Sequence, residues 1–133
     1  IRICLVGSEM CIRDRFSGAL LDQSLAVLTG SGQGALAGYA LDSAGDIDGD
    51  GLPDVLIGAP GDDTIAANAG AMFAVLAADL GGEAALWDVG IAISDGDSGA
   101  RTGETVAGIP ITDDQIVLGT SADKLAGFVL LSP

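Results

Sequence analysis

Residues 46–60 read DIDGDGLPDVLIGAP, and this stretch decides the fold. Residues 46–54 follow the pattern D-x-D-x-D-G-x-x-D, in which alternate positions carry carboxylates. Pro53 and the apolar run Val55–Ile57 then lead into an extended segment, because proline disfavours a continuing helix and β-branched residues favour strands. The pattern therefore predicts an acidic loop that joins two β-strands.

The acidic loop has the chemistry of a calcium site. Calcium binds six to eight hard oxygens, and alternate residues of a tight loop can supply carboxylates at a suitable spacing. Gly51 permits the sharp turn that such a loop needs. Four carboxylates this close together would repel one another without a cation, although an unliganded acidic turn is the alternative. We expect a Ca2+ ion with the following ligands: Asp46, Asp48, Asp50, the backbone carbonyl of Leu52, and Asp54.

The loop does not match an EF-hand. An EF-hand carries a bidentate glutamate at position 12 and continues into a helix. Counted from Asp46, position 12 of that motif falls on Ile57, which lies in the expected strand. The sequence therefore predicts a calcium site in a β-hairpin.

The chain carries an internal repeat. Val55–Pro60 aligns with Ile116–Ser121, and Thr29–Gly38 resembles Ser94–Gly103. Each copy consists of short apolar runs between Gly, Pro and Asp clusters, which is typical of strands and turns, and no window sustains a helical period. Four short strands in about sixty residues fit a propeller blade better than an immunoglobulin-like domain. Because Val55–Ile57 is continuously apolar, we expect neighbouring blades to cover it on both faces.

The predicted fold class is therefore all-β. We expect a partial β-propeller, with about one complete four-stranded blade and a degenerate second blade. An unrelated β-sandwich with accidental internal similarity is the alternative.

Residues 1–15 differ in character from the rest of the chain. They hold both cysteines and three of the five basic residues. Leu5–Asp14 resembles the translation of an adapter used to prepare sequencing libraries, so we interpret 1–15 as an artefact. The alternative is a natural strand in which Cys4 and Cys11 form a disulfide or bind a metal.

The remaining chain divides at its turn-rich segments. Phe16–Gly18 is interpreted as the end of the last strand of a preceding blade. Pro110–Gln115 stands where the second copy should have its acidic loop, so we expect that copy to bind no calcium. Asp62–Asp63 and Asp95–Gly99 are expected to be solvated loops, although the first pair could add charge near the metal. The predicted organisation is a remnant of a preceding blade with a linker over 16–27, a blade with the calcium loop over 28–83, and a degenerate, truncated blade over 84–133.

Four segments together resemble the FG-GAP repeat, and they are Gly38–Ala40, Gly45–Gly51, Asp54–Pro60 and Gly70–Phe73. The Gly-Ala-Pro signature is intact at residues 58–60, whereas Ala37 replaces the phenylalanine before Gly38. This family builds the seven-bladed propeller of integrin α chains and occurs in bacterial secreted proteins. The resemblance implies that the loop aspartates bind calcium between two strands of a blade, structurally and on the face away from the ligand. The resemblance to the FG-GAP repeat is weaker over residues 84–133.

The charge and composition of the chain limit the partners and activities to be expected of it. The formal net charge is −14, so nucleic acid and anionic membrane surfaces are not expected partners. No apolar run is long enough for direct insertion into a membrane. The chain has no histidine, and we expect no enzyme activity within it.

The resemblance implies a secreted or cell-surface protein in the extracellular space. We expect a calcium-binding structural repeat for adhesion or surface recognition, with an unknown protein or glycan ligand bound through missing blades. Neighbouring blades of the same chain are the other expected partners. The alternative is an accessory propeller of a secreted enzyme whose catalytic domain lies outside this fragment.

Overall fold

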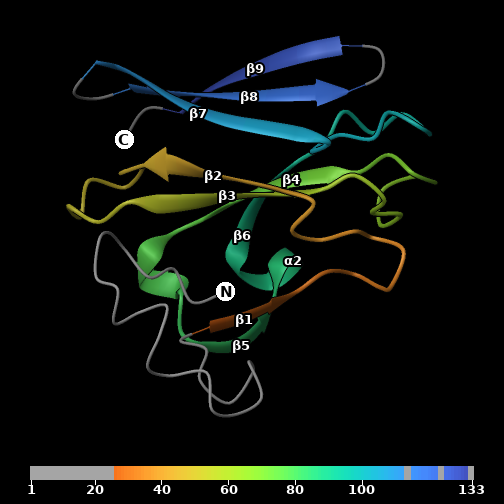
Figure 1. The fold of residues 1–133 in the computed structure, drawn as a ribbon, viewed down its shortest axis with the longest axis horizontal. Coiled ribbons are helices and arrows are strands. Elements are labelled where there is room, and N and C mark those ends of the chain that lie inside the picture. Colours follow the sequence, from red (N-terminus) through yellow and green to blue (C-terminus); the bar gives the residue numbers. More distant parts are fainter. Residues whose placement is uncertain (1–25, 113–114, 123–124, 132–133) are drawn as a thin grey trace, which may run out of the picture.

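The computed structural model describes residues 26–112, 115–122 and 125–131, and for residues 109–131 the description is confined to the course and pairing of the strands. The described residues form an all-β fold, as predicted, and its two larger sheets are antiparallel (Figure 1). Its central sheet has four strands, each antiparallel to its neighbours. In spatial order these are β2 (Ala40–Gly45), β3 (Asp54–Ala59), β4 (Ala71–Val75) and β6 (Gly90–Ile93).

Two smaller groups of strands lie on opposite sides of the central sheet (Figure 1). On one side is an antiparallel sheet of β7 (Thr105–Thr112), β8 (Gln115–Ala122) and β9 (Leu125–Leu131). On the other side β1 (Ala26–Thr29) and β5 (Gly82–Ala85) form a parallel pair. The 3-10 turn η2 (Ala77–Asp79) and the single helical turn α2 (Leu86–Val89) flank β5.

The fourth strand of the central sheet lies after residue 83, where the first blade was expected to end. Residues 90–93 pair with β4, so this sheet continues through Ile93. The sequence did not indicate this strand, because Gly90–Ile93 is short and has no alternating pattern of its own, and only its pairing with Phe73 and its neighbours reveals it. The helical turn at 86–89 was also not expected, because four residues are too few to show a helical period.

The centre of the sheet is apolar on both faces, as the run Val55–Ile57 predicts. Leu56 and Met72 pack with Val106 of β7 on one face. Ile57 and Phe73 pack on the other face with Leu86 of α2. Except for Val55, which is partly exposed, the residues of β3 are buried. A sheet covered on both faces in this way requires neighbouring layers, which is the packing of a propeller blade.

The internal repeat is confirmed at the level of backbone angles. Leu36 and Arg101 adopt φ angles of 55° and 54°, which is unusual for residues other than glycine. Two residues later, Gly38 and Gly103 have φ angles of 85° and 88°. Matching hydrogen bonds close the two turns, from Tyr39 N to the Leu36 carbonyl at 3.0 Å and from the Glu104 N to the Arg101 carbonyl at 3.2 Å. We refer to residues 31–38 and 96–103 as the two repeat-start turns.

The second repeat-start turn lies directly against the first blade. A Cβ atom at Gly58 would overlap the carbonyl of Gly103, and one at Gly70 would overlap the backbone of Thr102. A Cβ at Gly108 of β7 would overlap the carbonyl of Ser43. The backbones of the first blade and of the segment that follows it can therefore touch only because Gly58, Gly70 and Gly108 lack side chains.

Several predictions from the sequence concern residues outside the described ranges. These are the proposed artefact at 1–15 with Cys4 and Cys11, the strand end at Phe16–Gly18, and the acidic pair Asp113–Asp114. Thr112 pairs with Gln115, so only two residues separate β7 from β8, whereas eight separate β2 from β3. That spacing leaves no room for a second D-x-D-x-D-G-x-x-D loop.

The close contact at Gly58 predicts a large effect of a single methyl group. Gly58→Ala should lower the free energy of unfolding by about 1–3 kcal/mol, because the new Cβ must displace the backbone of Gly103. Gly32→Ala is the matched control, since a Cβ there meets no atom within 4 Å. Urea unfolding followed by circular dichroism measures both. Equal stabilities of the two variants would contradict the proposed contact.

Candidate metal centre

The acidic loop spans residues 46–53 and connects β2 to β3 at one end of the central sheet. Three glycines in or next to it adopt positive φ angles, with values of 70° at Gly45, 80° at Gly49 and 86° at Gly51. Other residues rarely adopt these angles, so the glycines allow the chain to fold back tightly. The spacing of glycine and aspartate in the sequence is therefore what shapes the loop.

Asp46 organises the loop from within. Its Oδ1 accepts hydrogen bonds from the backbone N–H groups of Gly49 at 2.7 Å and Asp50 at 3.0 Å. Its Oδ2 accepts a hydrogen bond from the N–H of Gly51 at 2.8 Å. Charge-assisted bonds of this kind are stronger than neutral ones, so the carboxylate holds the turn in place.

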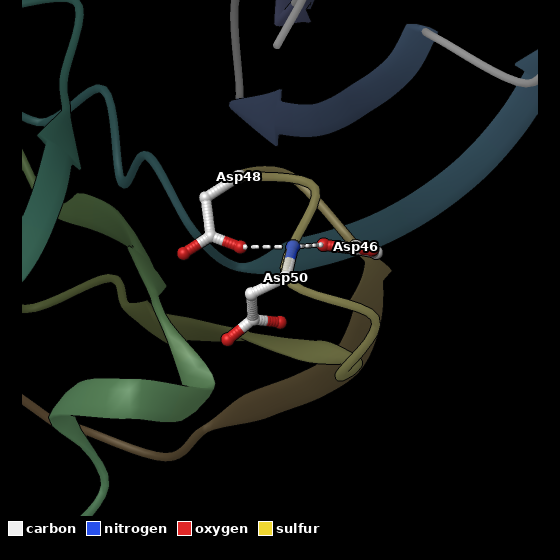
Figure 2. Close-up of side chains that lie close together, drawn as sticks. All are labelled: Asp46, Asp48 and Asp50. Carbon is white, nitrogen blue, oxygen red and sulfur yellow. Dashed lines mark hydrogen bonds between the residues drawn. The ribbon is translucent and has the colours of Figure 1, made fainter.

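Asp48 and Asp50 complete a group of three carboxylates. The N–H of Asp50 also lies 3.1 Å from Oδ1 of Asp48, so this amide sits between two carboxylates (Figure 2). Oδ1 of Asp50 in turn accepts the N–H of Leu52 at 2.7 Å. One oxygen atom from each of Asp46, Asp48 and Asp50 lies within 4.8 Å of the other two.

This arrangement fits a calcium ion. Calcium–oxygen bonds are 2.3–2.6 Å long, so two oxygens on one ion lie at most about 5 Å apart. The three carboxylates meet that limit. Carboxylate oxygens are hard ligands that suit calcium or magnesium rather than a thiophilic metal. The ion pair between Arg101 and Glu104 lies outside the loop, and no described basic side chain forms an ion pair with a loop aspartate. The negative charge of the loop is therefore not neutralised by a neighbouring cation of the protein.

The charges of the loop act on one another. The N–H of Asp50 lowers the pKa of the Asp48 carboxyl, but desolvation and the charges of Asp50, Asp54 and Asp46 raise it, and the net pKa lies above its ordinary value of 3.8. The loop therefore holds its negative charges at an electrostatic cost. A bound divalent cation would remove that cost.

Asp54 has a different place from the other three aspartates. Its side chain is only 1% exposed, and it does not belong to the three-residue group. Oδ2 accepts the N–H of Ile47 at 2.7 Å, and Oδ1 accepts the N–H of Ala77 at 2.8 Å. Asp54 thus ties the start of the loop and the turn η2 to the first residue of β3. The remaining expected ligand, the carbonyl of Leu52, belongs to a residue that is 53% exposed.

Asp62 is a buried carboxylate whose role the sequence did not reveal. It is 1% exposed, although Asp62–Asp63 reads as a polar loop. Oδ2 accepts hydrogen bonds from the Ser31 hydroxyl at 2.7 Å and from Trp87 Nε1 at 3.0 Å, and Oδ1 accepts the N–H of Thr64 at 2.8 Å. These donors come from the first repeat-start turn, from α2 and from the loop after β3.

The same hydrogen bonds hold Asp62 in its ionised form. Burial raises its pKa, but the bonds from Thr64, Trp87 and Ser31 outweigh burial and place the pKa below the ordinary value of 3.8. Trp87 also packs edge-on against Phe73, with ring centroids 5.1 Å apart. Asp62 therefore couples the outer turn α2 to the apolar core.

The fold and the loop define a class of protein: an all-β repeat of blade type with an acidic loop between its first two strands. A model of the FG-GAP repeat family matches residues 37–71, which span β2, the acidic loop, β3 and the start of β4. The chain therefore contains an FG-GAP repeat, as its sequence predicts. No curated protein matches the chain. Among the described residues there is no helix long and apolar enough to cross a membrane.

The buried position of Asp54 predicts a structural role that does not depend on metal. In calcium-free buffer, Asp54→Asn should lower the free energy of unfolding by about 2 kcal/mol, because an amide NH2 group would face one of the two N–H donors. The exposed residue Asp79 provides the control, and Asp79→Asn should change stability little. Chelator-treated protein unfolded in urea measures both. An Asp54→Asn variant as stable as the control would contradict this role.

The pKa of Asp62 predicts a specific loss of stability in acid. The folded-state pKa lies below the unfolded value, so ionised Asp62 stabilises the protein above the unfolded pKa and ceases to do so as the pH falls through the folded pKa. The stability difference between the native chain and Asp62→Asn should be constant above about pH 5 and shrink below about pH 4. The fluorescence of Trp87, the only tryptophan, follows unfolding at each pH. A difference that is unchanged down to acid pH would show that the Asp62 carboxylate does not supply this stability.

Proposed function

We propose that this chain is a calcium-binding structural repeat of an extracellular, integrin-like β-propeller that serves adhesion or surface recognition. The observation that carries the proposal is the group Asp46, Asp48 and Asp50 in the β2–β3 loop of an FG-GAP repeat. Three hard oxygen donors converge there, on a loop whose glycines already impose a tight turn.

Calcium would act by holding the hairpin in shape. The loop connects the two strands of the sheet that contact β7. A cation that joins the three carboxylates would therefore also stabilise the contact between the two sheets. Its binding free energy would be added to the folding free energy, because the loop is ordered only in the folded chain.

The partner would bind at a distance from calcium. The strands are antiparallel, so the β3–β4 loop and the repeat-start turns lie at the opposite end of the sheet from the acidic loop. We propose that a protein or glycan ligand is recognised through further blades, and that neighbouring blades of the same chain cover the remaining sheet faces. The chain itself would be a binding and structural module rather than an enzyme.

An extracellular location is consistent with the affinity expected of such a loop. Extracellular calcium modules bind with dissociation constants of about 10⁻⁴–10⁻³ M. This range suits a compartment that holds millimolar calcium and would leave the site empty at cytosolic calcium levels.

Calcium should therefore raise the melting temperature. At about 10 mM calcium the expected stabilisation is about 1–3 kcal/mol for one site of this affinity. Asp48→Asn should abolish the shift, whereas Asp97→Asn, an exposed aspartate outside the group, should preserve it. Thermal unfolding of the three proteins, each with calcium and with chelator, provides the measurement. The calcium proposal is withdrawn if the native chain melts at the same temperature in both buffers.

A further inference from the structure

The two repeat-start turns correspond residue by residue, because residue 31 of the first corresponds to residue 96 of the second, an offset of 65. In the first turn the N–H of Ala35 donates to the Gly32 carbonyl at 3.1 Å. In the second turn the N–H of Ala100 donates to the Asp97 carbonyl at 3.1 Å. Ala35 and Ala100 are both buried. Together with the matching φ angles, these bonds give the two turns the same backbone conformation.

The second turn is docked on the first blade through its backbone. The N–H groups of Gly99, Arg101 and Thr102 donate to three successive carbonyls of the β3–β4 loop. The acceptors are the carbonyls of Ala67 at 2.9 Å, Asn68 at 3.1 Å and Ala69 at 2.8 Å. Thr102 also forms a parallel bridge with Gly70, and it is only 2% exposed. A repeat-start turn therefore binds a run of carbonyls that ends at a glycine.

The corresponding donors of the first turn have no partner within the part of the chain that the structure describes. At the offset of 65 they are the N–H groups of Gly34, Leu36 and Ala37. Ala37 is exposed, whereas its counterpart Thr102 is buried. The first turn therefore carries the donors of a docking contact without the acceptors.

The apolar part of the contact is repeated in the same way. Val106 at the start of β7 is 8% exposed and packs with Leu56 and Met72 of the first blade. Its counterpart in β2 is Leu41, which is 46% exposed. Tyr39 is exposed on the same short segment. Exposed apolar side chains that lie together next to unpaired donors mark an interaction surface.

We propose that residues 34–41 form a docking surface for the β3–β4 region of another repeat of this kind. The partner supplies three successive carbonyls before a glycine, as residues 67–70 do, and a glycine in its own β3 at the place of Gly58. Its apolar residues at the places of Leu56 and Met72 cover Leu41. The inference rests on the propeller arrangement proposed above and not on calcium.

The docked turn also indicates which repeat is the partner. The second turn docks on the repeat directly before it in the chain. A second copy of the whole chain does not offer this surface on its first blade, because residues 99–106 already cover it there. The partner of the first turn is therefore a repeat joined on its N-terminal side.

The test supplies this repeat from the chain's own sequence. A copy of residues 31–95, one full period, is inserted between Gly30 and Ser31, so that the native first turn follows the copy as residue 96 follows residue 95. The tethered copy acts at high effective concentration. In the matched control chain the copied equivalent of Gly58 is replaced by alanine, whose Cβ would overlap the backbone of the docked turn. A second control replaces the copied equivalent of Gly32 by alanine, where a Cβ meets no atom within 4 Å.

Thiol labelling measures the docking, in chains with Cys4→Ser and Cys11→Ser. Leu41→Cys in the native repeat should label at least about tenfold more slowly behind the native copy, or behind the copy with the Gly32 replacement, than behind the copy with the Gly58 replacement. Ile65→Cys should label equally in all three chains, because Ile65 is exposed and lies near Gly96 of the second turn, which is docked in each chain.

Three results would overturn the proposal. The first is equal labelling of Leu41→Cys behind the native copy and behind the copy with the Gly58 replacement. The second is protection that rises with protein concentration, which would mean contact between separate chains. The third is rapid labelling of Val106→Cys behind the native copy, since a copy that docks in register should stabilise the blade that it covers.

This test and the calcium test can fail separately. A chain whose melting temperature rises with calcium, but in which Leu41→Cys is not protected, loses the docking surface alone. Protection of Leu41→Cys without a calcium shift contradicts only the calcium function.

Discussion

Contact between backbones at a few glycines holds the two sheets together, and the other packing depends on it. Gly58 and Gly70 of the first repeat lie against Gly103 and Thr102 of the second repeat-start turn. Without side chains at these points, β7 comes close enough to place Val106 in the apolar cluster with Leu56 and Met72. The glycine of Gly-Ala-Pro is thus explained by distance between layers rather than by a turn.

Two buried carboxylates complement this contact at the two ends of β3. Asp54 begins the strand and binds backbone donors of the acidic loop and η2. Asp62 follows the strand and binds donors from a repeat-start turn and from Trp87. Burying a carboxylate is costly unless hydrogen bonds compensate it, so each of these positions specifies one arrangement of its neighbours. Asp54 therefore anchors the start of the candidate calcium loop from its buried side. Asp46 holds the turn from within, and Asp48 and Asp50 are exposed.

The features that could be predicted are those encoded within a few neighbouring residues. The acidic loop, the burial of the Val55–Ile57 strand on both faces and the recurrence of the repeat-start turn all follow from local spacing and backbone preference. The strand Gly90–Ile93 could not be assigned to the first blade, because four residues carry too weak a pattern and its pairing with β4 is not local. The burial of Asp62 escaped prediction for a related reason, since its partner Trp87 lies 25 residues away.

The sequence by itself determined the chemistry of the loop, its position between two strands and the all-β repeat, because carboxylate spacing and glycine backbone angles act within one turn of chain. Only the tertiary structure decided that Asp46, Asp48 and Asp50 converge while Asp54 turns inward. It also decided that β5 leaves its own sheet to pair with β1. These outcomes depend on which distant donors and edges reach one another after the layers pack, and such contacts leave no mark in the local order of residues.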